Sequence, residues 1–338
     1  MEIPFTTRNW DNRVPAYVDL THRLGVRICG IWGRMEADPE KTQAVQIDRV
    51  AKLDMGYLTG SPVQNIIRRN KDWETNYSEE NLRKGVRNFF EKFGQYRPAV
   101  VNLGNEPHTK GEDVKIDIAA YKAVYTEIKK IDPNIFVVGT SVNLQEDHFK
   151  YGFGEWLDAY DFHIYEDAAS VRKIVGEGFP EMFRKYGFAK PIWSTELGLN
   201  SQGMARQFVA AEVYRKLVNF FAAGGANACW ACVVYPDPDG TMGDSFGSAH
   251  NTFDSRYSKY APKLDAVAYY NAVNNIAIKK FVEDRMYGDS THAFLFRDRD
   301  DQALQVWYRN KGREDVFIPL PGVGKVRVTR IDGSLRDM

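Results

Sequence analysis

Apolar residues along this chain follow two alternating spacings. Short continuous apolar runs, typical of buried strands, begin near residues 26, 55, 99, 135, 160, 192 and 226. Between several of them, apolar residues recur every three or four positions, which is the spacing of one helix face. This spacing is clearest over residues 79–93, 116–131 and 207–221. Continuous apolar strands that alternate with helices indicate a parallel sheet covered by helices, so the pattern predicts an α/β fold.

The number of recognisable strands is one short of a closed barrel. Seven strands can be counted, whereas a (β/α)8 TIM barrel has eight. The missing strand should precede a helix over residues 15–24, where only Ile3-Pro4-Phe5 offers a poor candidate. Two interpretations are open: an atypical first strand, or a sequence that begins inside a longer natural protein. We favour the second and predict a TIM barrel in either case.

The pattern changes after Tyr260. A helical spacing over residues 262–282 is followed by short alternating runs between turn residues, which is typical of antiparallel hairpins with one face in water. These runs cover residues 292–297, 303–308, 315–320 and 325–331. We therefore predict a barrel over residues 1–284 and a small β-rich accessory domain over residues 285–338. The polar end of the chain leaves open whether this second domain is complete.

Charge and composition exclude several classes of function. The 45 basic and 45 acidic residues cancel, so the chain has no net field to attract nucleic acid or an anionic membrane. No segment approaches the roughly 20 apolar residues of a membrane span. The first residues show no secretory signal, and both an extracellular and a cytoplasmic location stay open. The many aromatic residues mildly favour a carbohydrate ligand.

Metal and redox chemistry have little support in the sequence. Cys229 and Cys232 match a C-x-x-C motif, but they lie in an apolar run without a second ligand pair. We interpret them as buried strand residues. The six histidines are dispersed and none pair at ligand spacing, so no metal and no cofactor is predicted.

Two glutamates stand at the ends of predicted strands. Glu106 follows the apolar run 99–101 within Asn105-Glu106-Pro107, and Glu196 ends the strand that begins at Ile192. The catalytic groups of a TIM barrel lie at the carboxyl ends of its strands, so we expect the two carboxylates to meet there. Paired carboxylates in such a place cleave glycosidic bonds.

In strand order, residues 20–260 resemble the retaining β-glycosidases of clan A. The matching motifs are Asn105-Glu106-Pro107 on strand four and Trp193-Ser194-Thr195-Glu196-Leu197-Gly198 on strand seven. The β-rich tail is similar to the accessory domain of the β-xylosidase and iduronidase relatives. The resemblance implies that Glu106 is the acid/base, Glu196 the nucleophile, and Asn105 the amide that binds the sugar 2-hydroxyl.

Further candidates carry less weight. The resemblance assigns His163 and Tyr165 to the subsite around the nucleophile, with Tyr165 donating a hydrogen bond to Glu196. His163 could equally be a satisfied core histidine. Trp230 matches the tryptophan that forms the floor of the −1 subsite, with barrel packing as its alternative. Trp32 is either a second aromatic platform or a rim residue, and Arg27 is a candidate cation beside the nucleophile.

We therefore expect a retaining β-glycoside hydrolase that acts on a β-linked glycan or glycoside without a cofactor. Two alternatives stay open: a transglycosylase with the same glutamates, and a catalytically silent carbohydrate-binding barrel. The long loops 61–77 and 236–262 should wall the cleft and set specificity. The sugar, the linkage, exo or endo action and the oligomeric state are not determined by the sequence.

Overall fold

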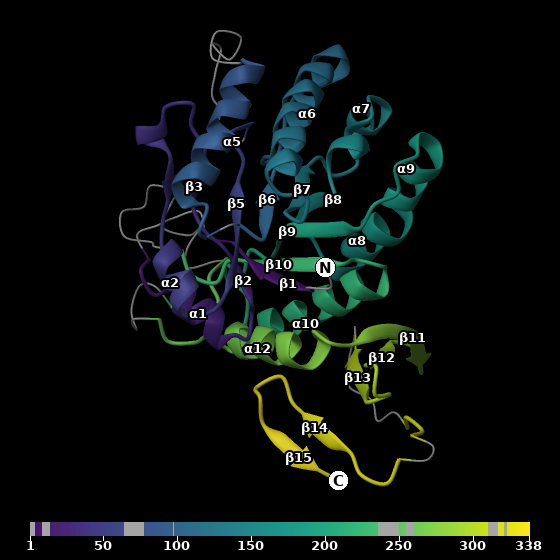
Figure 1. The fold of residues 1–338 in the computed structure, drawn as a ribbon. Coiled ribbons are helices and arrows are strands. Elements are labelled where there is room, and N and C mark those ends of the chain that lie inside the picture. Colours follow the sequence, from purple (N-terminus) through teal and green to yellow (C-terminus); the bar gives the residue numbers. More distant parts are fainter. Residues whose placement is uncertain are drawn as a thin grey trace.

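The chain folds into a closed parallel barrel followed by small antiparallel sheets (Figure 1). The computed structural model describes residues 4–8, 14–63, 78–96, 98–235, 250–254, 260–309, 317–320 and 323–338. Around the barrel the strand order is β1-β10-β9-β8-β7-β6-β5-β2. The strands are β1 (Phe5–Thr7), β2 (Ile28–Gly30), β5 (Gly56–Gly60), β6 (Val100–Asn102), β7 (Phe136–Ser141), β8 (Ala159–Ile164), β9 (Ile192–Gly198) and β10 (Asn227–Ala231). The predicted TIM barrel is confirmed.

The first strand of the barrel is present as β1. Our preference for a first strand that precedes this sequence was therefore wrong. β1 is only three residues long, but it pairs in parallel with β10 on one side and with β2 on the other. It escaped notice because two of its three residues are threonines, which favour strands without contributing to an apolar run. The first strand of the barrel is therefore present in this sequence, in an atypical form.

The outer wall of the barrel consists of helices (Figure 1). The longer ones are α5 (Glu79–Phe93), α6 (Val114–Ile131), α10 (Arg206–Ala222) and α12 (Leu264–Ile276), with α1 (Tyr17–Arg23), α2 (Ile47–Lys52), α7 (Glu146–Lys150), α8 (Ala168–Lys173) and α9 (Phe179–Tyr186) between them. The buried face of α5 carries Leu82, Val86, Phe89 and Phe90, at the spacing that the sequence predicted. None of the helices in the described residues combines the length and the apolarity that crossing a membrane requires.

One apolar layer fills the interior of the barrel. It contains one residue from each of six strands: Ile28, Leu58, Val100, Val138, Ala159 and Trp193. The Trp193 ring is buried and stacks on Phe136, with 5.0 Å between ring centroids. This layer closes the interior, so any site must lie above it, at the carboxyl ends of the strands.

The antiparallel strands begin earlier than expected. The helix predicted over 262–282 ends at Ile276, and β11 (Lys280–Tyr287) starts before the expected domain boundary at 285. The position of Phe281 is compatible with both a helical spacing and a strand pattern. In the structure it pairs with Phe296 on the neighbouring strand, so this segment forms a strand. Strand β11 forms a sheet with β12 (Thr291–Arg297) and β13 (Ala303–Arg309). The division of the chain into two domains stays a prediction.

The strands after β13 differ in part from expectation. Within the described residues, 317–320 form no strand, and the rest of the run expected over 315–320 lies outside them. The C-terminal hairpin joins β14 (Arg327–Thr329), which lies in the run predicted over 325–331, to β15 (Leu335–Asp337), which lies in the segment interpreted as a polar tail. Near the start of the chain, a small hairpin of β3 (Gly33–Arg34) and β4 (Gln43–Ala44) occupies part of the segment before α2.

Truncating Trp193 should destabilise the barrel strongly. Trp193→Ala removes a ring that fills the interior layer, and we expect a loss of about 3–5 kcal/mol in unfolding free energy. Trp307→Ala on β13, where the side chain is 40% exposed, is the matched control and should cost within roughly 1 kcal/mol. Urea denaturation followed by circular dichroism measures both. Equal losses in the two variants would contradict the role of Trp193 in the core.

Candidate active site

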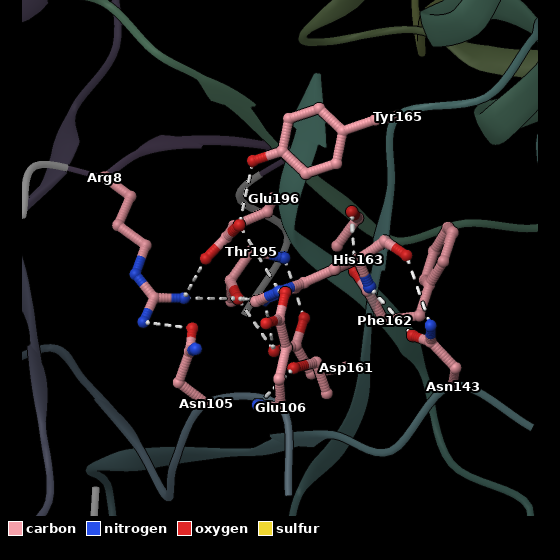
Figure 2. A network of polar contacts seen from close by, with 12 residues as sticks. Arg8, Asn105, Glu106, Asn143, Asp161, Phe162, His163, Tyr165, Thr195 and Glu196 are labelled. Atoms are coloured by element: carbon pink, nitrogen blue, oxygen red, sulfur yellow. Dashed lines mark hydrogen bonds and ion pairs between the residues drawn. The ribbon is translucent and has the colours of Figure 1, made fainter. Parts of the chain in front are cut away.

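The two glutamates meet at the carboxyl ends of the strands, with His163 between them (Figure 2). Glu106 follows β6, Glu196 lies in β9 and His163 lies in β8. The Nδ1 atom of His163 is 2.9 Å from Oε1 of Glu106 and 3.4 Å from Oε2 of Glu196. One oxygen of each carboxylate and the ring nitrogen all lie within 4.8 Å of one another. The expected pairing of the glutamates is thus present in the geometry.

The two carboxylates differ in their access to solvent. The side chain of Glu106 is 40% exposed, whereas that of Glu196 is only 8% exposed. Tyr165, directly after β8, donates a hydrogen bond of 2.9 Å from its hydroxyl to Oε2 of Glu196, as the sequence predicted. Glu196 is therefore held at the bottom of the site, and Glu106 stands at its mouth.

A buried arginine that the sequence analysis missed lies against Glu196. Arg8 directly follows β1, and its Nη1 is 3.4 Å from Oε1 of Glu196. The same guanidinium donates hydrogen bonds to Oγ1 of Thr195 at 3.0 Å and to Oδ1 of Asn105 at 3.1 Å (Figure 2). Gly30 on β2 permits this approach, because a Cβ there would lie 2.9 Å from Cα of Arg8.

A hydrogen-bond chain behind His163 fixes its ring. The Nε2 atom is 3.0 Å from Oγ1 of Thr195 and 3.6 Å from Oδ2 of Asp161. Asp161 is fully buried and accepts hydrogen bonds from the backbone N–H and the hydroxyl of Thr195, each at 2.7 Å. Each of the two ring nitrogens of His163 therefore faces at least one hydrogen-bond acceptor.

The surrounding charges keep His163 protonated. Burial disfavours the imidazolium, but the nearby carboxylates, Glu196 first and then Asp161 and Glu106, outweigh it and raise the pKa of His163 to about 9. At neutral pH the ring is a cation that donates toward both glutamates. The role of His163 in a substrate subsite stays a prediction, with a satisfied core histidine as its alternative.

The end of β7 holds the backbone of both Glu106 and His163. The backbone N–H of Glu106 donates to Oγ of Ser141 at 2.9 Å. The Asn143 side chain accepts from the His163 N–H at 2.9 Å and donates to its carbonyl at 3.3 Å. Glu106 has φ 45° and Asn143 has φ 49°, a left-handed conformation that is uncommon for glutamate and tolerated by asparagine. Such backbone conformations persist only where surrounding contacts enforce them. They are found frequently at functional sites.

Two predicted aromatic residues and one predicted cation lie elsewhere. Trp230 is in register with Thr7, whose hydroxyl contacts Tyr17 of α1, so both side chains point out of the barrel. The Trp230 ring packs 6.3 Å from the Tyr269 ring of α12, which matches its packing alternative. Arg27 is exposed beside the inward-facing Ile28 and does not reach Glu196.

Trp32 takes no part in the described network. Trp32 is half-buried just beyond β2, with the Arg34 guanidinium 5.8 Å from its ring centroid. Most of the loops 61–77 and 236–262 falls outside the described residues. Their contribution to specificity stays a prediction.

Among the described residues, Glu106, His163 and Glu196 form a cluster whose donor atoms could hold a metal ion. The Arg8 guanidinium lies 3.4 Å from Oε1 of Glu196, so one oxygen of that carboxylate already has a cationic partner from the chain. The three cysteines are free and buried.

Comparisons with known proteins place the fold among glycoside hydrolases. No family model and no curated protein matches the sequence. The structure is similar to a family 39 glycoside hydrolase from Bacteroides cellulosilyticus WH2, with a TM-score of 0.67 and 15% identity over 97% of this chain and 73% of that one. A glucosidase from Croceicoccus marinus gives a TM-score of 0.61 and 14% identity, over 86% of this chain and 76% of that one.

A similar fold recurs in an enzyme that is named for another sugar. A β-glucuronidase from an uncultured Clostridium species gives a TM-score of 0.54 and 12% identity, over 81% of this chain and half of that one (50%). At such identities the likeness shows a shared fold. The predicted barrel is thus confirmed, and membership of clan A stays a prediction.

The charge of His163 can be measured directly. In ring-¹⁵N spectra of histidine-labelled protein, we expect His163 to titrate near its pKa of about 9 and to be a cation at pH 7. His148 is the internal control, because burial lowers its pKa to about 4 and it should stay neutral. In Glu196→Gln the His163 midpoint should fall, since the largest stabilising charge is gone. A His163 midpoint at or below the usual 6.5 would contradict the described network.

Proposed function

We propose that this chain is a retaining β-glycoside hydrolase that uses Glu106 as acid/base and Glu196 as nucleophile. The single observation that carries the proposal is the pair of strand-end carboxylates joined through His163. Retaining enzymes need their carboxyl groups about 5–5.5 Å apart, whereas inverting enzymes need about 6.5–9.5 Å. Oxygens of Glu106 and Glu196 within 4.8 Å of each other favour the retaining arrangement.

The exposure of the two side chains supports this division of roles. In the first step, Glu196 attacks the anomeric carbon while Glu106 gives its proton to the departing oxygen. In the second step, Glu106 removes a proton from the water that hydrolyses the glycosyl ester. The acid/base must meet leaving group and water, and Glu106 is the more exposed. The nucleophile must be fixed, and Glu196 is held by Tyr165 and Arg8.

The charges of the site support a protonated Glu106 before reaction. Arg8 and His163 supply two positive charges, and the buried carboxylates of Asp161 and Glu196 supply two negative ones. A third ionised carboxylate would place one uncompensated negative charge next to the buried carboxylate of Glu196, and this like-charge repulsion costs free energy. A neutral Glu106 removes this excess and carries the proton that the leaving group requires.

Asn105 is the residue we assign to the sugar 2-hydroxyl. Its side chain is nearly buried, and its Oδ1 accepts from Arg8, which orients the amide N–H₂ away from the guanidinium. An amide donor held in this way stabilises the transition state without reorganisation. The relatives named above act on different sugars, so we assign the substrate only as a β-linked glycan or glycoside.

Covalent labelling tests the mechanism and the sugar together. A panel of 2-deoxy-2-fluoro aryl glycosides (xylo, gluco, galacto, manno, glucurono) should yield one stable adduct, which peptide mapping places on Glu196. Glu196→Gln should not be labelled and should lose at least about 10³-fold in turnover. Glu127→Gln is the matched control and should behave as wild type, because Glu127 is a nearly buried carboxylate on α6 that is held by Arg83 and Arg87 of α5. An adduct elsewhere, or none from any sugar, would refute the proposal.

Removing Glu106 should affect substrates according to their leaving group. In Glu106→Ala we expect a loss of roughly 10²–10⁴-fold in glycosylation with alkyl or sugar leaving groups. Activated aryl glycosides should lose far less, because their leaving groups depart without a proton. Glu112→Ala, whose side chain is 72% exposed, should change neither class. Steady-state kinetics across a leaving-group series measures this, and equal losses for all substrates would argue against an acid role.

A further inference from the structure

A lysine is buried behind the strand that carries the nucleophile. Lys216 lies on α10 with 0% of its surface exposed. Lysine is almost never fully buried without a partner, because its ammonium loses its hydration. Its Nζ donates a hydrogen bond to the backbone carbonyl of Gly198, the last residue of β9. This carbonyl is two residues beyond Glu196.

The same ammonium faces the segment that follows β8. Burial lowers the pKa of Lys216 to about 8, against the opposing attraction of Glu212, Glu166 and Asp167. The Glu166 carboxylate accepts from the backbone N–H of Tyr165 at 3.1 Å, and Asp167 caps the start of α8 by accepting from Ser170. Lys216 therefore lies where the end of β9 and the segment after β8 come together.

Gly198 connects this lysine to the site. A Cβ on Gly198 would lie 2.5 Å from Cε1 of Tyr165 and 2.8 Å from the carbonyl oxygen of Ala231. Its backbone thus packs directly against the Tyr165 ring, whose hydroxyl donates to Glu196. A displacement of Gly198 would move the ring, and with it the donor that orients the nucleophile.

We propose that Lys216 is a positioning residue for the nucleophile: by fixing the Gly198 carbonyl, it holds the Tyr165 hydroxyl on Glu196. The proposal rests on the proposed glycosidase function. It concerns the orientation of Glu196 during attack and not the binding of the sugar. Loss of the ammonium should therefore slow the covalent step and leave sugar affinity nearly unchanged.

The test is the inactivation of Lys216→Met by the 2-fluoro glycoside that labels the wild type. We expect the limiting rate of inactivation to fall about ten- to a hundredfold, as misplacement of a reacting group predicts. The dissociation constant of the reagent should stay within about twofold. Lys129→Met is the matched control, since Lys129 also bonds a backbone carbonyl, that of Ile135, and the Asp158 carboxylate. It should show wild-type values for both constants even if it melts earlier.

A double-mutant cycle separates positioning from a general loss of structure. If Lys216 acts through Tyr165, then Lys216→Met should cost little more in a Tyr165→Phe background. If Lys216→Met does not fold, Lys216→Gln takes its place with the same expectation. A wild-type rate of inactivation, or fully additive losses, would overturn this proposal alone. Absence of labelling in the wild type would overturn the proposed function and this proposal with it.

Discussion

The cluster of buried charges at the carboxyl end of the barrel sets the requirements for the rest of the structure. Two cations, Arg8 and His163, lie among the carboxylates of Asp161, Glu196 and Glu106. A charge removed from water is tolerated only beside an opposite charge or a hydrogen-bond donor, so each member depends on its neighbours. These residues come from β1, β6, β8 and β9, and only closure of the barrel brings them together.

Residues around the cluster hold its members in fixed positions. Ser141 and Asn143 at the end of β7 hold the backbone of Glu106 and His163. Gly30 and Gly198 provide the close approach that Arg8 and Tyr165 need. Each of these four residues thus fixes a member of the site: Glu106 itself, His163 between the glutamates, or the Arg8 and Tyr165 side chains that contact Glu196. The fold thus supplies the rigidity that a covalent mechanism requires from its first layer of residues.

The sequence predicted the barrel and the glutamates because both leave strong signals. Continuous apolar strands are visible without alignment, and an ionisable residue at a strand end is rarely explained by packing. Two of the errors share a cause: side chains on a strand alternate between faces, so a one-residue difference reverses their direction. Trp230 and Arg27 fell on the outer face for this reason. Arg8 was missed because β1 is short, and Lys216 because a helix pattern does not reveal what a buried lysine contacts.

The charge of the cluster explains how one site can serve both steps of a double displacement. In the double displacement that we propose, Glu196 loses its charge when it forms the glycosyl ester, and Glu106 becomes ionised as its proton leaves with the aglycone. The net charge of the cluster is therefore zero both before and after the first step. The cluster comprises the side chains of Arg8, Asp161, His163, Glu106 and Glu196. His163 lies between the two glutamates and can favour whichever of them is negative. The protein environment then needs no reorganisation between the steps, which is the condition under which fixed charges accelerate a reaction most.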